Sequence, residues 1–106
     1  MADMTWQELN TIDRDALMER MARELPHISG EMGTTPIGIA YRTGLNKDRM
    51  ELLVSGRRKM KWSEYMSILF VLWDDNKGRD MVEEKELFPN MLKKAMKVNR
   101  NAHGER

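Results

Sequence analysis

The chain has 106 residues, a length that suits one domain with short extensions and a core stable without crosslinks. It has no cysteine, which excludes disulfides and thiolate metal sites, and its longest apolar run, residues 68–73, is far shorter than the roughly 20 residues of a membrane span. The net charge of +1 is unevenly spread: residues 42–61 carry seven bases and two acids between two acidic flanks, a pattern typical of a polyanion-binding surface and also of an ordinary solvated one.

Apolar residues recur at intervals of three and four, with no strand-like alternation, and predict an all-α chain. We expect one compact domain of about five helices. Residues 1–33 should form an N-terminal helical segment that packs on the remainder. Thr5 and Glu8 suit a capping box at its start, and Pro26 is expected to end or kink its helix, with a further helical turn over residues 26–31.

Residues 34–75 are expected to form the core of the domain. Thr35 and Pro36 predict the start of a helix over residues 36–42, because threonine caps a helix N-terminus and proline suits the first helical position. Gly44 follows as the end of this helix, where the backbone needs a residue that tolerates a left-handed conformation.

A second helix is expected over residues 47–54. Asn46 is its predicted cap, since asparagine accepts hydrogen bonds from free amides at a helix start, and Gly56 ends it. Residues 57–61 then form a loop rich in basic side chains.

The rest of the chain is also expected to be helical. Ser63 is the predicted cap of a nearly all-apolar helix over residues 64–73, which should be the most buried one. Residues 76–98 should form C-terminal helices that contact a second copy in a dimer or pack back on their own domain. These helices are expected at residues 80–87 and 89–98. Residues 99–106 have little to bury and are expected to form a disordered tail.

Two helices that cross steeply over a short turn need particular residues at particular positions. A small residue lets the helices touch, a glycine accommodates the turn, an apolar residue seals it and a polar side chain caps the second helix. The second helix then needs buried residues three apart. The residues that meet these needs are Ala40, Gly44, Leu45, Asn46, Met50 and Leu53, with Gly56 ending the second helix. The opposite face of that helix carries Lys47, Asp48, Arg49 and Leu52.

With this order and spacing the segment resembles the lambda-repressor/Cro family of helix-turn-helix proteins, closely over residues 35–56 and loosely over residues 18–73. The resemblance implies that residues 47–54 are a recognition helix that enters the major groove of DNA. It implies base-facing positions for Lys47, Asp48, Arg49 and Leu52. It implies phosphate-facing positions, which set affinity and register, for Thr35, Ser55, Arg57, Arg58, Lys59 and Lys61.

Three features depart from the family pattern. Pro36 stands where the family has a glutamine that touches a phosphate, and Val54 and Ser29 stand where it has a paired glutamate and arginine. Asp48 is an acid at a base-facing position. There it can accept a hydrogen bond from a cytosine amino group, hold a neighbouring basic side chain, or mark a surface that binds something other than DNA.

The function implied by the resemblance is a sequence-specific transcriptional regulator, a repressor that binds a short palindrome in double-stranded DNA as a homodimer. The alternative is a protein-binding module on the same fold, such as an antitoxin or a small phage-encoded effector. No catalytic spacing, phosphate-binding glycine loop or metal-ligand cluster occurs, so we expect no enzyme activity, metal, cofactor or small-molecule substrate. The first residues lack a secretory pattern, and we expect a cytoplasmic, nucleoid-associated protein of bacterial or phage origin.

Overall fold

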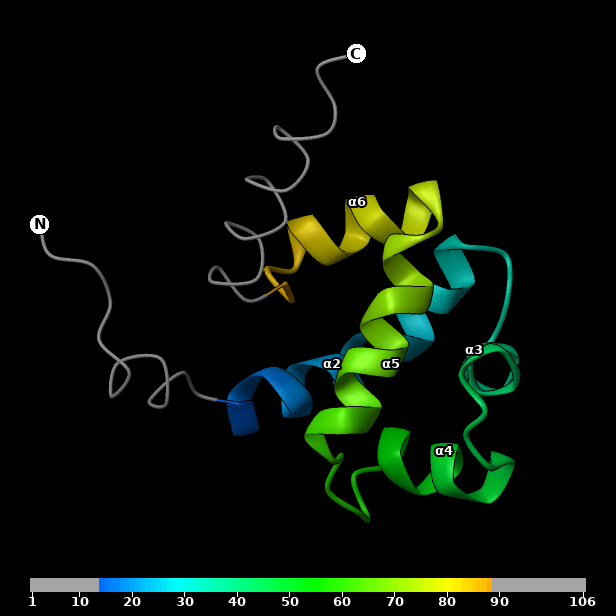
Figure 1. Ribbon diagram of the computed structural model, residues 1–106, viewed down its shortest axis with the longest axis vertical. Helices are drawn as coiled ribbons and strands as arrows, with labels where there is room; N and C mark the ends of the chain where they lie inside the picture. The colour runs from blue at the N-terminus through cyan, green and yellow to red at the C-terminus, as the bar shows by residue number, and fades with distance from the viewer. Residues whose placement is uncertain (1–13, 89–106) are drawn as a thin grey trace, which may run out of the picture. The chain divides into compact units, whose positions relative to one another are not determined.

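The computed structural model describes residues 14–88, which form five α-helices and no strand (Figure 1). The predicted all-helical fold is therefore confirmed. The helices are α2 (Arg14–Glu31), α3 (Pro36–Thr43), α4 (Lys47–Val54), α5 (Trp62–Trp73) and α6 (Asn76–Glu84). The described helices include none that is long and apolar enough to cross a membrane. The predicted capping box at Thr5 and Glu8, the helix over residues 89–98 and the disordered tail lie outside the described residues.

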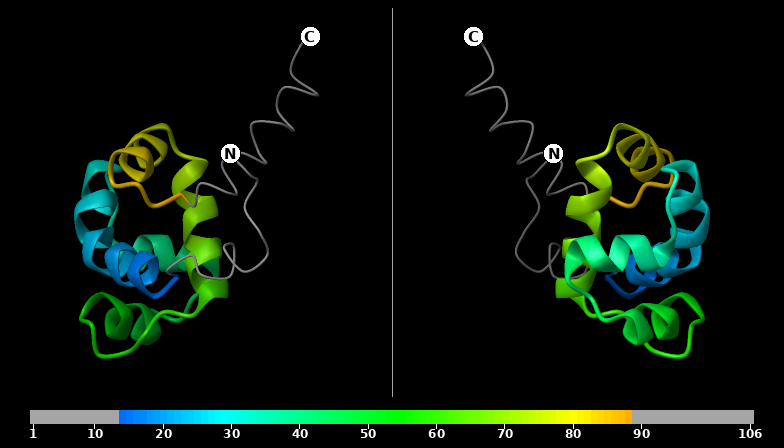
Figure 2. Two further views of the ribbon diagram at one scale, coloured as in Figure 1. Left: turned by 90° about the vertical axis from the view of Figure 1, so that its left-hand side faces the viewer. Right: turned by 90° about the vertical axis from the view of Figure 1, so that its right-hand side faces the viewer.

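The core of residues 14–87 lies between α2 and α5, which face each other across it (Figure 2). In the same views α6 lies at one end of this core and α4 at the other. The two long helices supply most of the fully buried side chains, because each places an apolar stripe inward at helical spacing. These buried residues are Met21, Leu25 and Ile28 of α2 and Tyr65, Ile68 and Leu72 of α5.

Burial of α5 is less complete than the sequence predicts. Its inner face is fully covered, but Phe70 is 69% exposed. The nearly continuous apolar sequence therefore reflects one buried face and one face that the rest of residues 14–88 leaves uncovered. A hydrophobic run alone does not distinguish these two arrangements, since both satisfy the helical period.

The prediction that Pro26 ends or kinks the first helix is wrong in one respect: α2 continues through it to Glu31. A proline inside a helix removes the bond from its own nitrogen to the carbonyl four residues earlier, and its ring crowds that carbonyl, but the helix can continue on both sides. Here Pro26 is exposed, and its own carbonyl accepts a hydrogen bond from the Ser29 hydroxyl at 3.2 Å. Ser29 is fully buried, so this bond also satisfies a hydroxyl in the core.

Two helix starts also differ from the predictions. The helix α5 begins at Trp62, so Ser63 lies within its first turn and Lys61 occupies the cap position. The helix α6 begins at Asn76 because the Asp75 carboxylate accepts a hydrogen bond from the Gly78 amide at 2.9 Å. Gly78, predicted to lie before this helix, is instead inside its first turn.

The C-terminal segment was expected either to bind a second copy or to pack on its own domain. In the described part of this segment, Met81, Val82 and Leu87 are buried within the domain. The Leu87 carbonyl also accepts a hydrogen bond from the hydroxyl of Tyr65. These residues therefore serve the domain's own core.

Candidate nucleic-acid interface

The turn between α3 and α4 has the geometry that its sequence predicts. Thr35 caps α3 by accepting a hydrogen bond from the Gly38 amide at 3.2 Å. At the other end Gly44 adopts a left-handed conformation with φ of 80°, which favours glycine, and its amide donates to the Ala40 carbonyl. The Leu45 amide donates to the same carbonyl at 3.0 Å. The chain thus turns within three residues, and α3 is seen end-on where α4 is seen lengthwise (Figure 1).

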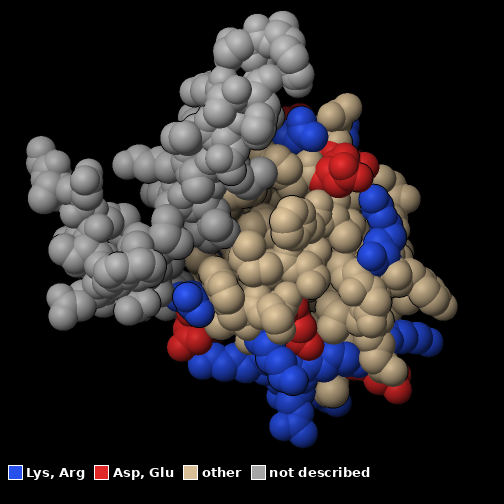
Figure 3. All heavy atoms as spheres, viewed as in Figure 1, with Lys and Arg blue, Asp and Glu red and all other residues tan. Residues whose placement is uncertain are grey.

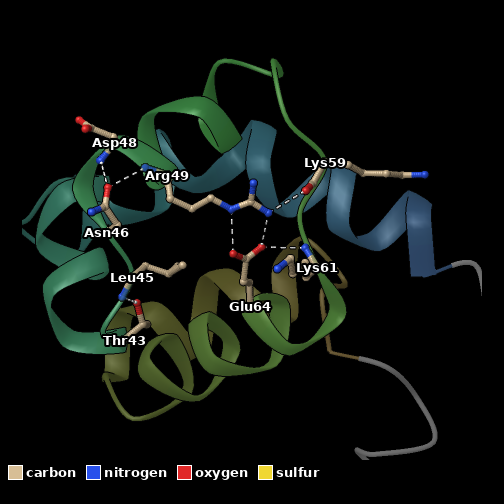
Figure 4. A network of polar contacts seen from close by, with 8 residues as sticks. All are labelled: Thr43, Leu45, Asn46, Asp48, Arg49, Lys59, Lys61 and Glu64. Atoms are coloured by element: carbon tan, nitrogen blue, oxygen red, sulfur yellow. Dashed lines mark hydrogen bonds and ion pairs between the residues drawn. The ribbon is translucent and has the colours of Figure 1, made fainter.

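The cap of α4 is Asn46, whose side-chain oxygen accepts hydrogen bonds from the amides of Asp48 at 2.7 Å and Arg49 at 3.2 Å (Figure 4). Beyond this cap Met50 and Leu53 are both fully buried. Ala40 is 2% exposed. The cap and the buried pair together set which face of α4 is turned outward.

That outward face is formed by Lys47, Asp48 and Glu51, all exposed, with Leu52 half-buried beside them. Glu51 was not among the residues predicted to face DNA. The spacing of Glu51 does predict its place, because it lies four residues after Lys47 and three after Asp48, and residues three or four apart share one face of a helix. The exposed side chains on this face are one base and two acids, so the face itself does not attract a polyanion.

Arg49 does not lie on this face, which corrects the sequence prediction. Its guanidinium forms a bidentate pair with the Glu64 carboxylate of α5, with both nitrogen–oxygen distances 2.9 Å (Figure 4). The side chains are only 25% and 13% exposed. The hydrogen bond from Arg49 holds the pKa of Glu64 below its ordinary value, and the same bond raises the pKa of Arg49. Both groups therefore remain charged and engaged with each other at neutral pH.

The basic loop, defined here as residues 57–61, follows α4 directly. Gly56, with φ of 80°, turns the chain so that the amides of Arg57 and Arg58 both donate to the Leu52 carbonyl, at 3.0 and 3.2 Å. Met60 is buried, at 4% exposure, and holds the loop against the core. The four basic side chains are exposed; they are Arg57, Arg58, Lys59 and Lys61.

These cations gather at the end of the domain that carries α4 (Figure 3). Lys59 also lies 3.2 Å from the Asp15 carboxylate, with side-chain exposures of 71% and 67%. An ion pair this exposed contributes little to stability and exchanges readily for another anion. The pair with Asp15 therefore leaves the Lys59 ammonium group accessible at the surface, like the other three cations of the basic loop.

The two hydroxyl groups predicted to face phosphates have partners within the chain. The Thr35 hydroxyl oxygen accepts the α3 capping bond, which leaves its own proton free to donate, whereas the Ser55 hydroxyl donates to the Leu52 carbonyl at 3.1 Å. Both residues are exposed. Across residues 14–88 no cluster of histidine, aspartate and glutamate could hold a metal ion.

Comparisons of the chain with protein-family models, curated proteins and solved structures found no match.

Proposed function

We propose that the protein is a sequence-specific DNA-binding regulator of transcription, a repressor that inserts α4 into the major groove and places the basic loop on the adjoining phosphates. The observation that carries the proposal is that the exposed face of the short helix α4 and the four exposed cations of the basic loop lie at the same end of the domain. A major groove admits one α-helix, and basic side chains next to such a helix can reach the flanking backbone.

Phosphate contacts account for the affinity in this proposal, because the outward face of α4 carries more acid than base. Each phosphate neutralised by the loop releases counterions, so the logarithm of affinity should fall by about 0.9 for each tenfold rise in salt per contact. The basic loop has four cations, so its contacts can contribute at most about 3.6 to the slope of log affinity against log salt. In this proposal Lys47 and Asp48 supply the sequence specificity. The Asp48 carboxylate can accept a hydrogen bond from the amino group of a cytosine.

The test is binding of a labelled random duplex pool over a series of salt concentrations. The matched variants are Arg57→Ala and Lys77→Ala; each removes one exposed cation, and only the first lies in the basic loop. We expect Arg57→Ala to weaken binding to all sequences equally and to lower the salt slope by about 0.9, the share of one phosphate contact. Lys77→Ala should behave as the wild type. No detectable binding of any duplex at about 50 mM salt would overturn the proposal.

Base reading is tested by selecting bound sequences from the same pool. Asp48→Ala should change the preferred sequence at one position, at a cost of about 1–3 kcal/mol for the lost base contact. Leu52→Ala should weaken a preference for thymine at one position, because the shortened side chain loses its contact with the thymine methyl group. A preferred sequence identical to that of the wild type in both variants would argue against insertion of α4 into the groove.

A homodimer on a palindrome is part of the same proposal. Its half-sites should then lie about 10 base pairs apart or at a multiple of that spacing. Because Met81, Val82 and Leu87 are buried in their own domain, the contact between copies must use other surfaces. Symmetric half-sites in the selected sequences, together with a dimer mass in light scattering, are the expected results.

A second candidate function is supported by the acids on α4. Asp48 and Glu51 outnumber Lys47 on the outward face, and Arg49 is engaged by Glu64, so this face suits a basic protein surface as well as a base edge. For such a protein-binding module, Asp48→Lys with Glu51→Lys should abolish the complex. In that case duplex binding should be absent in the wild type, and Arg57→Ala should have no effect on the complex.

A further inference from the structure

Four hydrogen bonds join α4, α5 and the basic loop at a single point (Figure 4). Two of them form the bidentate pair between Arg49 and Glu64. The third runs from the Arg49 guanidinium to the Lys59 carbonyl at 3.1 Å, and the fourth from the Lys61 amide to the Glu64 carboxylate at 2.8 Å. We call these two side chains, with the main chain of Lys59 and Lys61, the loop clamp.

The loop clamp holds the second half of the basic loop, and the turn at Gly56 holds the first half. On the first side the amides of Arg57 and Arg58 are fixed on the Leu52 carbonyl. On the second side the main chain is fixed at two points by the clamp, and the buried Met60 lies between those two points. The loop main chain is thereby tied at both ends, while its four basic side chains remain exposed.

We propose that Arg49 and Glu64 are positioning residues that hold the basic loop at a fixed place beside α4, so that the loop and the helix meet the same duplex. This inference rests on the DNA-binding function proposed above. Arg49 then acts through the loop and not on a base. A guanidinium suits this positioning role because it presents several hydrogen-bond donors in one plane. Here the Arg49 side chain donates two bonds to Glu64 of α5 and one to the main chain of the basic loop.

The inference makes Arg49 and Glu64 act as a unit. Arg49→Ala frees the Lys59 carbonyl and leaves the Glu64 carboxylate without its cation, whereas Glu64→Ala frees the Lys61 amide. Either change should loosen the same loop, so the double variant should be little worse than either single one. If Arg49 instead contacted a base, Arg49→Ala alone would weaken binding and would change the preferred sequence, and Glu64→Ala would not.

A charge swap separates positioning from simple stabilisation of the fold. Arg49→Glu combined with Glu64→Arg can restore an ion pair between α4 and α5. It cannot restore the two loop bonds, because the introduced carboxylate has no proton to donate to the Lys59 carbonyl and the introduced guanidinium cannot accept from the Lys61 amide. The swapped protein should therefore regain much of its stability without regaining an ordered loop.

The experiment measures amide hydrogen exchange at Lys61, the midpoint of urea unfolding and the salt slope of duplex binding for the wild type, both alanine variants and the swap. We expect exchange at Lys61 to be at least about tenfold faster in Glu64→Ala and in the swap, because the amide loses its acceptor. We expect salt slopes lower by about 0.9 per lost phosphate and an unchanged preferred sequence in the variants.

The exchange measurement needs no DNA and so separates the two proposals. Unchanged exchange at Lys61 in Glu64→Ala overturns the loop clamp even where the wild type binds duplex. A swap that regains the wild-type salt slope also overturns it, since the pair would then be only a structural tie. A new preferred sequence in Arg49→Ala assigns Arg49 to base reading. Absence of duplex binding by the wild type overturns the proposed function, and with it the clamp's role in binding, whatever the exchange shows.

Discussion

Substitution of Gly78 by alanine should destabilise the protein, although glycine-to-alanine changes inside helices are usually stabilising. The reason is the close approach of α6 to the end of α5. A Cβ atom at position 78 would lie 2.3 Å from the Leu72 carbonyl oxygen and 3.0 Å from its carbon. Both are backbone atoms, so one helix must move to make room for the methyl group.

The expected magnitude combines two opposed terms. Replacing a helical glycine by alanine is worth up to about 1 kcal/mol in favour of the folded state. Forcing an extra methyl group into closely packed structure costs about 1–3 kcal/mol, and more where backbone must shift. Because both neighbours of the added methyl group are backbone atoms, the cost lies at the upper end of that range, and we expect a net loss of about 2 kcal/mol. For a domain of this size each kcal/mol lowers the melting temperature by roughly 4–8 °C.

The matched control is Gly30→Ala in α2. Gly30 is exposed, and a Cβ there would meet nothing within 4 Å, so this change should stabilise the fold by about 0.5 kcal/mol. Urea unfolding followed by circular dichroism measures both variants on the same scale. A Gly78→Ala protein as stable as the wild type would refute the close approach of the two helices.

Three further predictions follow from single contacts. Asn46→Ala removes the cap of α4 and should cost about 1 kcal/mol in unfolding free energy, whereas Asn46→Asp keeps the acceptor and should cost less. Tyr65→Phe leaves the buried Leu87 carbonyl without its side-chain donor and should cost about 1–2 kcal/mol by the same assay, with no change in duplex binding. The pKa of Glu64 is lowered in the folded state from an ordinary value of 4.5, mainly by its bond from Arg49, so the stability it contributes is present above that pH and is lost as the pH falls through the lower folded value. Stability should therefore fall less steeply below about pH 4.5 in Glu64→Gln than in the wild type, and parallel curves would contradict this assignment.

The parts of the fold that could be read from the sequence are those set by contacts between near neighbours. Thr35, Gly44 and Asn46 each act on amides or carbonyls within a few residues, so residue type and spacing were enough to predict α3, its turn and α4. The same holds for the division of α4 into a buried face and an exposed one. The start of α6 is also set by a local contact, but it was predicted too late in the chain. Asp75 caps this helix, which begins at Asn76.

Other features depend on partners far away in the chain and could not be read in this way. Pro26 remains inside α2 because the helix packs on the core on both sides of it, through Leu25 and Ile28. The exposure of Phe70 depends on which face of α5 the other helices cover, and the apolar sequence of α5 does not specify that face.

Helical periods, caps and turns are properties of short segments, so the amino-acid sequence was enough to predict an all-helical domain, two helices joined by a short turn over residues 36–54 and the basic loop next to them. The tertiary structure was needed to show that Arg49 turns away from the outward face to Glu64, 15 residues later in the chain. This pairing is not a property of a short segment, because it requires the fold to place the partly buried Glu64 carboxylate of α5 within 2.9 Å of the Arg49 side chain of α4.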